Sequence, residues 1–486
     1  MIKSICIVGG GSSGWMTATT MAKLLKCENI TLIESPNVPI SGVGESTAQQ
    51  ILEWINLIGV DEKEMIRHTD GSIKHSIKFT NFLRKDSGSF HYPFGPLTHN
   101  PKDWWDAHES FGYSSVNEYA ENINPLALVS KRGKVDTTMP HAFHFDAIKF
   151  GQYLKKTYCK DVNHVVAEVI GYDKNDDGIR CLNLDNGEKI ESDLFIDCTG
   201  FRSLLLGQYL QEPFIPYNHL IPNDRAWATQ VSYTDKEKQL NTYTECTAIE
   251  NGWVWNIPLW TRIGTGYVYS SKHVSDEDAK QQLINHLNSK GFDTEEHQFR
   301  KIHMRIGRHK RTFVKNVVAI GLSAGFIEPL ESNGLFTVHQ NLIDLYKTLR
   351  RGKPSQFMKD MYNSATSLSF DEFADFVGVH YTFTQREDTQ YWRDNFNRSY
   401  DIESRENFDK YGLSAFSREL YKFSYYNNPN AGFHYIASGM NVSANTRFDS
   451  NASFLSEMKN NIDQWENVIE TLPSHYEYLR DEIYSQ

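Results

Sequence analysis

The sequence Gly9-Gly10-Gly11-Ser12-Ser13-Gly14 follows a short apolar run, Ser4 to Val8, and precedes a helical stretch, Trp15 to Leu25. A second apolar run, Ile30 to Ile33, ends at Glu34, which gives the order strand, glycine turn, helix, strand. Glycines let the backbone approach a pyrophosphate, and a helix N-terminus offers unpaired N–H groups and positive partial charge. Glu34 lies about 20 residues beyond Gly14, where a carboxylate can reach a ribose hydroxyl. The segment predicts an α/β fold that binds a dinucleotide; a tight turn without a ligand is the alternative.

A second segment, Asp193-Leu194-Phe195-Ile196-Asp197-Cys198-Thr199-Gly200-Phe201, has the pattern of a buried strand that delivers an acidic residue into a glycine turn. It resembles the late FAD motif of hydroxylase-like flavoproteins, with Asp197 on the cofactor side. Only one dinucleotide fingerprint is present, so no separate NAD(P)H domain is predicted. We therefore expect a partner flavin reductase to supply reduced flavin.

Composition narrows the class of protein. The 486 residues can bury a large core, and 13% of them are aromatic, which suits stacking surfaces and an apolar pocket. A net charge of −11 argues against nucleic-acid binding. The six cysteines lack CxxC spacing and no signal peptide is visible, so we expect a cytoplasmic protein. No apolar run reaches about 18 residues, so no membrane span is expected. The histidines are not at ligand spacing with cysteines or carboxylates, so no metal site is predicted.

Periodicity predicts the remaining elements. Strands are expected at His164 to Ile170, Ile179 to Leu184, Lys189 to Ile196, Ala226 to Val231, Trp253 to Pro258, Gly266 to Ser270 and Asn316 to Ile320. Hairpin turns are expected at Asn175 to Gly178 and at Asp185 to Gly187. Helices are expected at Gln49 to Ile58, Glu62 to Lys78 (interrupted at Asp70-Gly71) and Gly334 to Leu349, and an ordered loop at residues 86–102. Beyond Pro354 the chain is mostly helical and aromatic. We predict an FAD-binding and catalytic domain with an inserted substrate-side sheet over residues 1–350, and a helical region over residues 351–486 that covers the substrate pocket.

Three further motifs follow the fingerprint in order: Gly71-Ser72-Ile73-Lys74-His75-Ser76-Ile77-Lys78-Phe79, Gly252-Trp253-Val254-Trp255-Asn256-Ile257-Pro258 and Glu328-Pro329-Leu330-Glu331-Ser332-Asn333-Gly334. Together they resemble the flavin-dependent halogenases of the tryptophan-halogenase type. The resemblance implies a hydroxylase-like FAD-binding fold with a mixed substrate-side sheet. It also implies FAD used as FADH2, O2 and a halide (chloride, bromide or iodide) as cofactors.

Trp253, Trp255 and Ile257 are spaced by two, so on a strand they point to one face. A packed sheet face is the ordinary interpretation of that spacing. The resemblance implies instead that these residues, with Pro258, shield the flavin from organic substrate and divert it from hydroxylation to halide oxidation.

Lys74 and Lys78 are one helical turn apart, and most such lysines are solvated surface residues. The flanking Ile73, Ile77 and Phe79 suggest a half-buried helix, in which burial would lower a lysine pKa. By the resemblance Lys74, rather than Lys78, takes the catalytic position and holds hypohalous acid by a hydrogen bond or as a haloamine.

The third motif has an acidic residue near a helix N-terminus, which is ordinarily dipole complementation. The resemblance implies that Glu331 assists halogenation and accepts the ring proton, with Ser332 beside it. It places a halide at Asn333 and Gly334, where free helix N–H groups would cradle an anion.

Other site positions follow from the same resemblance. Further cofactor contacts are expected at Ser35, Val38, Val43, Ser46, Val169 and Leu335. Tyr92 and Phe94, in Phe90-His91-Tyr92-Pro93-Phe94-Gly95, match the loop whose aromatics sandwich an indole, although the core of a loop would have the same composition. In Asn430-Ala431-Gly432-Phe433-His434-Tyr435 the family's tyrosine pair is altered, so a simpler indole, a phenol or another electron-rich ring is expected rather than free tryptophan.

The predicted function is FADH2-dependent halogenation of an electron-rich aromatic ring. A flavin-dependent hydroxylase is the alternative enzyme, and a non-catalytic FAD-binding protein is the alternative of another class. A homo-oligomer is possible.

Overall fold

A computed structural model describes residues 2–25, 27–38, 45–95, 124–295, 297–397, 402–411, 429–442 and 452–485. These residues form two compact units, each built from three segments of the chain. The first unit contains Met1–Gly71, Phe145–Asn218 and Met304–Phe373, and the second Ser72–His144, His219–His303 and Ala374–Gln486. The units thus interleave along the chain, and the predicted division at residue 350 stays a prediction.

A six-stranded sheet is the centre of the first unit. Its order is β20 (Phe313–Val314), β21 (Val317–Ala319), β12 (Leu194–Asp197), β1 (Ser4–Val8), β2 (Asn29–Glu34) and β8 (Asn163–Val166). All neighbours pair in parallel except β20 with β21. The central strands are continuous apolar runs because a parallel sheet is covered on both faces.

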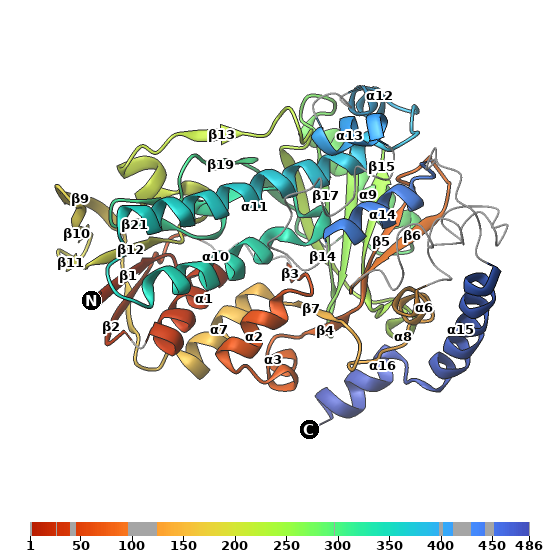
Figure 1. The fold of residues 1–486 in the computed structure, drawn as a ribbon, viewed down its shortest axis with the longest axis horizontal. Coiled ribbons are helices and arrows are strands. Elements are labelled where there is room, and N and C mark those ends of the chain that lie inside the picture. Colours follow the sequence, from red (N-terminus) through yellow and green to blue (C-terminus); the bar gives the residue numbers. More distant parts are fainter. Residues whose placement is uncertain are drawn as a thin grey trace. The chain divides into compact units, whose positions relative to one another are not determined.

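Helices α1 (Ser12–Thr20), α7 (Ala147–Tyr158) and α10 (Asn333–Leu349) lie beside this sheet, and α1 contacts the other two (Figure 1). The same unit contains η1 (Met21–Leu25), α2 (Ile51–Ile58), α3 (Glu62–His68), η2 (Gly200–Arg202), η3 (Leu204–Tyr209), η4 (Gly321–Ser323), η5 (Pro329–Glu331), β3 (Glu45–Ser46), β13 (Phe214–Pro216), β19 (Gly307–His309) and β22 (Gly325–Phe326). The predicted turn at Asn175–Gly178 is confirmed, since it joins β9 (Val169–Asn175) to β10 (Gly178–Leu184), which pairs in turn with β11 (Lys189–Glu191).

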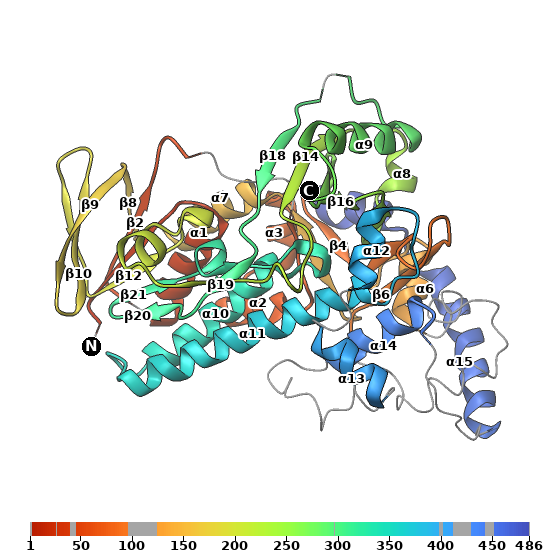
Figure 2. The same ribbon diagram turned by 90° about the horizontal axis from the view of Figure 1, so that it is seen from above.

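A seven-stranded mixed sheet is the centre of the second unit. Its order is β18 (Arg300–His303), β14 (Arg225–Val231), β17 (Ile263–Tyr269), β16 (Gly252–Pro258), β15 (Tyr243–Ile249), β5 (Ser76–Thr80) and β6 (Ser89–Pro93). Helix α9 (Asp276–Ser289) covers one face, where Ala279, Leu283 and Leu287 pack against Val254 and Tyr267 (Figure 2). Beside the sheet, β4 (Ser72–Lys74) pairs antiparallel with β7 (Ala142–Phe145).

The predicted helix from Glu62 to Lys78 is wrong beyond His68. Residues 72–74 and 76–80 are strands, because partner strands take up their backbone hydrogen bonds and Ile73, Ile77 and Phe79 favour extended backbone. The predicted loop at 86–102 is also partly wrong, since residues 89–93 form β6, and residues 96–102 lie outside the described ranges.

The C-terminal part is helical in the described ranges, as predicted. Its helices are α11 (Gln356–Thr382), α12 (Gln390–Phe396), α13 (Glu403–Tyr411), α14 (Pro429–Gly439), α15 (Ala452–Thr471), α16 (His475–Tyr478) and η8 (Leu479–Tyr484), and the second unit also contains α6 (Pro125–Lys131) and α8 (Lys236–Gln239). Among the helices of the described residues, none has both the length and the apolar character needed to cross a membrane.

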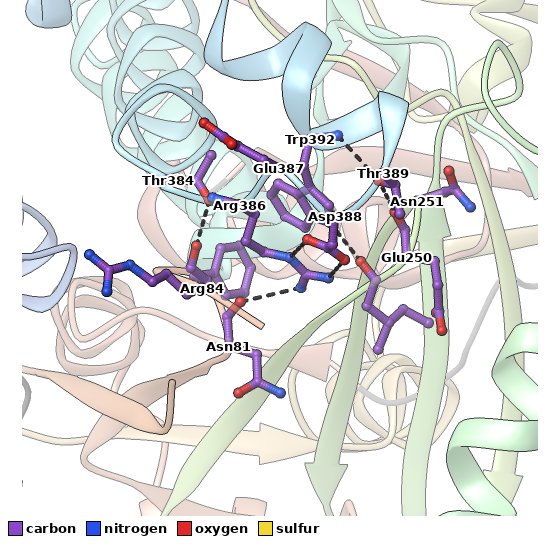
Figure 3. Close-up of polar contacts among 12 residues, drawn as sticks. Asn81, Arg84, Glu250, Asn251, Thr384, Arg386, Glu387, Asp388, Thr389 and Trp392 are labelled. Atoms are coloured by element: carbon purple, nitrogen blue, oxygen red, sulfur yellow. Dashed lines mark hydrogen bonds and ion pairs between the residues drawn. The ribbon is translucent and has the colours of Figure 1, made fainter. Parts of the chain in front are cut away.

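Arg386 holds the connection between α11 and α12 to the sheet (Figure 3). Its guanidinium donates to both carboxylate oxygens of Asp388, at 2.9 and 2.7 Å, and to the Asn81 carbonyl at 3.3 Å. It also lies 4.5 Å from the centre of the Trp392 ring, whose N–H donates to the Ile249 carbonyl. Arg386, a buried cation, therefore bonds this connection to the turn after β5. Trp392, on which it stacks, bonds to the end of β15.

Candidate active site

The glycine turn after β1 is built by close backbone contacts. Gly9 has φ +119°, and a Cβ there would lie 2.2 Å from the Cys198 carbonyl oxygen; one on Gly14 would lie 1.8 Å from the Gly9 carbonyl oxygen. A Cβ on Gly11 would meet nothing within 4 Å, and no side chain caps the N-terminus of α1. Gly9 and Gly14 are thus required for packing, whereas Gly11 borders open space at a helix N-terminus. The turn therefore fits a dinucleotide pyrophosphate. This is the ligand predicted for the motif Gly9, Gly10, Gly11, Ser12, Ser13 and Gly14.

Glu34 ends β2, and its carboxylate lies against the glycine turn. A Cβ on Gly10 would be 2.3 Å from Glu34 Cδ, so any larger residue there would have to displace the Glu34 side chain. His164 Nε2 lies 2.8 Å from Glu34 Oε2, and Ser35 donates a hydrogen bond to Glu168. His164 and Glu168 were not predicted here, because the pairing of β2 with β8 that brings them to Glu34 and Ser35 is not visible in local patterns.

Asp197 is fully buried and bonded entirely within the chain. Oδ1 accepts from the Thr199 N–H and hydroxyl, at 3.0 and 2.6 Å, and Oδ2 from the Leu205 and Leu206 N–H groups, at 2.7 and 2.9 Å. Its carboxylate therefore shapes the turn after β12, and a direct contact with a cofactor stays a prediction.

The other predicted cofactor positions are spread over the first unit. Val38 is exposed, Val169 and Leu335 are buried, and Ser46 lies on β3. Val43 lies outside the described residues.

The N-terminus of α10 carries the predicted halide residues. Ser332, in the left-handed region at φ +56°, precedes the helix, and its hydroxyl lies 3.0 Å from that of Ser46. Asn333 Nδ2 donates to the Glu328 carbonyl at 3.1 Å, and a Cβ on Gly334 would meet nothing within 4 Å. No side chain caps this helix of 17 residues, so its first N–H groups can face an anion.

Trp253, Trp255 and Ile257 share one side of β16, here called the tryptophan face, as their spacing predicts. The side chain of Val254 points the other way, into the cluster under α9. Register neighbours on the tryptophan face are small, apart from Val268 opposite Trp253 (the small ones are Ala226, Ala228, Cys246, Ala248 and Gly266). The Trp255 ring lies over Gly266. Both indoles are buried, and neither N–H has an acceptor among the described residues. The tryptophan face is thus distinct from the face that α9 packs.

Lys74 lies on β4, opposite Ala142, and its side chain is completely buried. Its Nζ lies 5.2 Å from the centre of the Phe94 ring. Lys78 differs, since it is partly exposed and lies 3.6 Å from Glu245 Oε1. The predicted half-buried helix is therefore wrong, but the two lysines have the contrasting environments expected of a functional and a surface residue.

Ser72 ties the Lys74 strand to the tryptophan motif. Its hydroxyl donates to the Pro258 carbonyl at 2.6 Å, at the end of β16. Within the second unit, the strand that carries Lys74 is thereby bonded to the end of β16, and Lys74 itself lies beside Phe94. Glu331, Ser332, Asn333 and Gly334 belong to the first unit, so the assembly of all these residues into one centre stays a prediction.

Tyr92 lies on β6 between helical aromatics, 5.7 Å from the Tyr435 ring centre and 6.4 Å from that of Phe376. Asn124 Nδ2 donates to the Tyr435 hydroxyl at 2.7 Å. Asn124 and Phe376 were not predicted, since they come from segments distant in sequence.

Histidines near the Lys74 strand are buried and neutral. Burial lowers the pKa of His75 to about 4 and that of His475 to about 3. Burial first, and then the nearby Lys74 charge, also lowers the pKa of His144 well below its ordinary value. In the first unit, burial and the Asp146 carboxylate raise the pKa of Glu45 to about 7. Among the described residues, no group of three or more His, Cys, Asp or Glu could hold a metal ion.

The sequence model of the tryptophan halogenase family matches residues 4–447. The chain belongs to that family. This halogenase is 33% identical to tryptophan 6-halogenase SttH of Streptomyces toxytricini, over 98% of this chain and 97% of the relative. It is 30% identical to tryptophan 7-halogenase RebH of Lentzea aerocolonigenes, over 99% of each.

Solved structures agree with this assignment. The crystal structure of SttH superposes with a TM-score of 0.89 at 31% identity, over 98% of this chain and 99% of that one. The VirX1 apo structure superposes with a TM-score of 0.89 at 33% identity, over 99% and 100%. The predicted family and fold class are confirmed, and the protein is a flavin-dependent halogenase that uses FADH2, O2 and halide. Halogenases of this family use a separate flavin reductase and an aromatic substrate.

Proposed function

We propose that the halogenase transfers halogen to an electron-rich, indole-like ring, with Lys74 as the residue that holds hypohalous acid. The observation that carries this proposal is the complete burial of the Lys74 ammonium beside the Phe94 ring. A buried ammonium has little competition from water and can donate a hydrogen bond to a small oxidant. An aromatic substrate stacked near Phe94 would lie within reach of it.

The remaining roles follow from residue chemistry. When bound at the glycine turn, reduced FAD supplies, with O2, the oxidising power that converts halide into hypohalous acid. The N–H groups of Asn333 and Gly334 hold the halide. As the ring attacks the halogen and the O–X bond breaks, Lys74, which holds the oxygen of HOX by a hydrogen bond, gives a proton to the departing hydroxide. Glu331 takes the ring proton, whose return restores the Lys74 ammonium, so that Ar–H and HOX become Ar–X and water. The tryptophan face keeps the organic substrate from the flavin, with Ser332 orienting the groups beside Glu331.

The substrate is proposed as a class. SttH and RebH are named for tryptophan, and Tyr92 and Phe94 provide aromatic surface for an indole. The altered segment at residues 430–435 favours a simpler indole, a phenol or another electron-rich ring over free tryptophan. A cytoplasmic location and a homo-oligomeric state belong to the same proposal.

Replacement of Lys74 by Ala tests the central role. We expect Lys74→Ala to lower aryl halide formation by at least about 100-fold, because the oxidant loses its hydrogen-bond donor. FAD binding, followed by flavin fluorescence, should persist. Lys78→Ala is the matched control, since it removes a lysine four residues away that is paired with Glu245 at the surface.

Products are measured by mass spectrometry on a panel of indoles, phenols and tryptophan, with reduced flavin, O2 and chloride, bromide or iodide. A chlorine or bromine isotope pattern, or the mass increase for iodine replacing hydrogen, supports the proposal. Wild-type product formation by Lys74→Ala would remove the role of Lys74, and a product heavier by one oxygen atom would indicate hydroxylation instead.

A further inference from the structure

Near Lys74, a chain of hydrogen bonds joins four strands, β16, β4, β7 and β15. The Ser72 hydroxyl contacts the Pro258 carbonyl at 2.6 Å and His144 Nδ1 at 3.1 Å, and His144 Nε2 contacts the Thr244 hydroxyl at 2.9 Å. The side chains of Ser72 and His144 are completely buried, and that of Thr244 is 4% exposed.

The chemistry of these groups fixes every proton. A carbonyl only accepts, so the single hydroxyl proton of Ser72 goes to Pro258. Ser72 can then only accept from the imidazole, so Nδ1 of His144 carries a proton. Because burial and the nearby Lys74 charge keep the ring neutral, Nε2 has a lone pair and accepts from Thr244.

The register of β4 and β7 relates this chain to Lys74. Ser72 pairs with His144 and Lys74 with Ala142, so His144 is the diagonal neighbour of Lys74 on the same face. The small side chain of Ala142, directly opposite, leaves room for the long side chain of Lys74. Because Ser72 and Lys74 are two positions apart on β4, a movement of Ser72, or of His144 bonded to it, would also move Lys74.

We propose that Ser72, His144 and Thr244 form a positioning relay, in which His144, held as the Nδ1–H tautomer, fixes the Lys74 strand against the Pro258 end of β16. The relay rests on the proposed function of Lys74. Its members touch neither substrate nor oxidant, and act by holding the ammonium where hypohalous acid and ring meet. A displacement of about 1 Å at such a point can lower a rate by about 100-fold.

The protonation state is tested on the wild-type protein by ¹⁵N NMR with labelled histidine, with His144→Asn used to assign the ring signals. We expect a protonated Nδ1 and an unprotonated Nε2 at neutral pH. An Nε2–H tautomer or an imidazolium at His144 would overturn the relay, regardless of the activities measured for the variants below.

The effect on Lys74 is tested by a pair of substitutions on one strand. Thr244→Val removes the donor to Nε2, whereas Thr247→Val removes a buried hydroxyl that has no hydrogen-bond partner among the described residues. We expect Thr244→Val to lower the ratio of aryl halide to hypohalous acid formed by about 10-fold, with hypohalous acid formation and FAD binding unchanged. Thr247→Val should keep the wild-type ratio.

His144 itself gives a rescue test. His144→Ala should lower the same ratio by about 10- to 100-fold, and His144→Asn, which retains an N–H donor toward Ser72, should recover most of it. If Lys74→Ala loses the product while Thr244→Val and His144→Ala keep the wild-type ratio, the relay is overturned and Lys74 keeps its role. If Lys74→Ala halogenates normally, the proposed function and the relay fall together.

Discussion

At the scale of single residues, neighbouring glycines of one turn have different reasons to be glycine. Gly14 has no room for a methyl group, because the Gly9 carbonyl oxygen occupies its place at 1.8 Å. Gly11 has room, since a Cβ there would meet nothing within 4 Å. Packing therefore requires glycine at position 14 but not at position 11.

This difference predicts opposite results for two similar variants. Gly11→Ala should fold with nearly the wild-type melting temperature but bind FAD at least about 10-fold more weakly, because the methyl group occupies space meant for the pyrophosphate. Gly14→Ala should lower the free energy of unfolding by about 1–3 kcal/mol through overpacking. Thermal unfolding without FAD and fluorescence titration with FAD measure the two effects. Unchanged FAD affinity in Gly11→Ala would contradict the prediction that the pyrophosphate lies against Gly11.

At the scale of elements, the connection between α11 and α12 depends on a buried ion pair. Burial alone would raise the pKa of the Asp388 carboxyl, but two hydrogen bonds from Arg386 outweigh it and the pKa is lowered. The stabilisation is therefore present above the ordinary pKa of Asp388 and is lost as the pH falls through the lowered value. The Trp392 ring covers the guanidinium, so charge, hydrogen bonds and stacking all depend on one side chain.

Arg386→Met should destabilise the protein by about 3 kcal/mol, because it leaves Asp388 without its partner in a partly buried place. Arg386→Met with Asp388→Asn should recover part of that loss, since the uncompensated charge is then gone. Chemical denaturation followed by tryptophan fluorescence measures both. Additive losses in the double variant would show that the two side chains do not interact.

At the scale of the whole molecule, the chain has one dinucleotide fingerprint and two interleaved units. The first unit contains the glycine turn, and the second contains Lys74 and the tryptophan face. Nothing in the sequence indicates a second nucleotide domain that could reduce flavin within the same chain. The electrons for catalysis are therefore expected to arrive as diffusible FADH2.

Chemically reduced FAD should consequently replace the reductase. Enzyme, halide and aromatic substrate mixed with FADH2 and then with O2 should form one aryl halide per FADH2 at most, without NAD(P)H or a second protein. Mass spectrometry of the quenched mixture measures the yield. A strict requirement for reductase protein, even with FADH2 in excess, would indicate direct transfer between bound partners instead.

The sequence by itself determined the features that depend on local pattern. The glycine turn, the parallel strands, the hairpin at Asn175–Gly178 and the common face of Trp253, Trp255 and Ile257 follow from periodicity and glycine geometry, and the family follows from the ordered motifs.

Only the tertiary structure decided features that depend on distant partners. Lys74 lies on a strand because β7 and β15 take up the hydrogen bonds of its segment, a non-local pairing that overrides a helical spacing of lysines. His164 reaches Glu34, and His144 reaches Ser72, through strand pairing that no local pattern contains. The hydrogen bonds from Asn124 to Tyr435 and from Thr244 to His144 likewise join segments that are distant in sequence. Long-range strand pairing determined which of two similar lysines is buried.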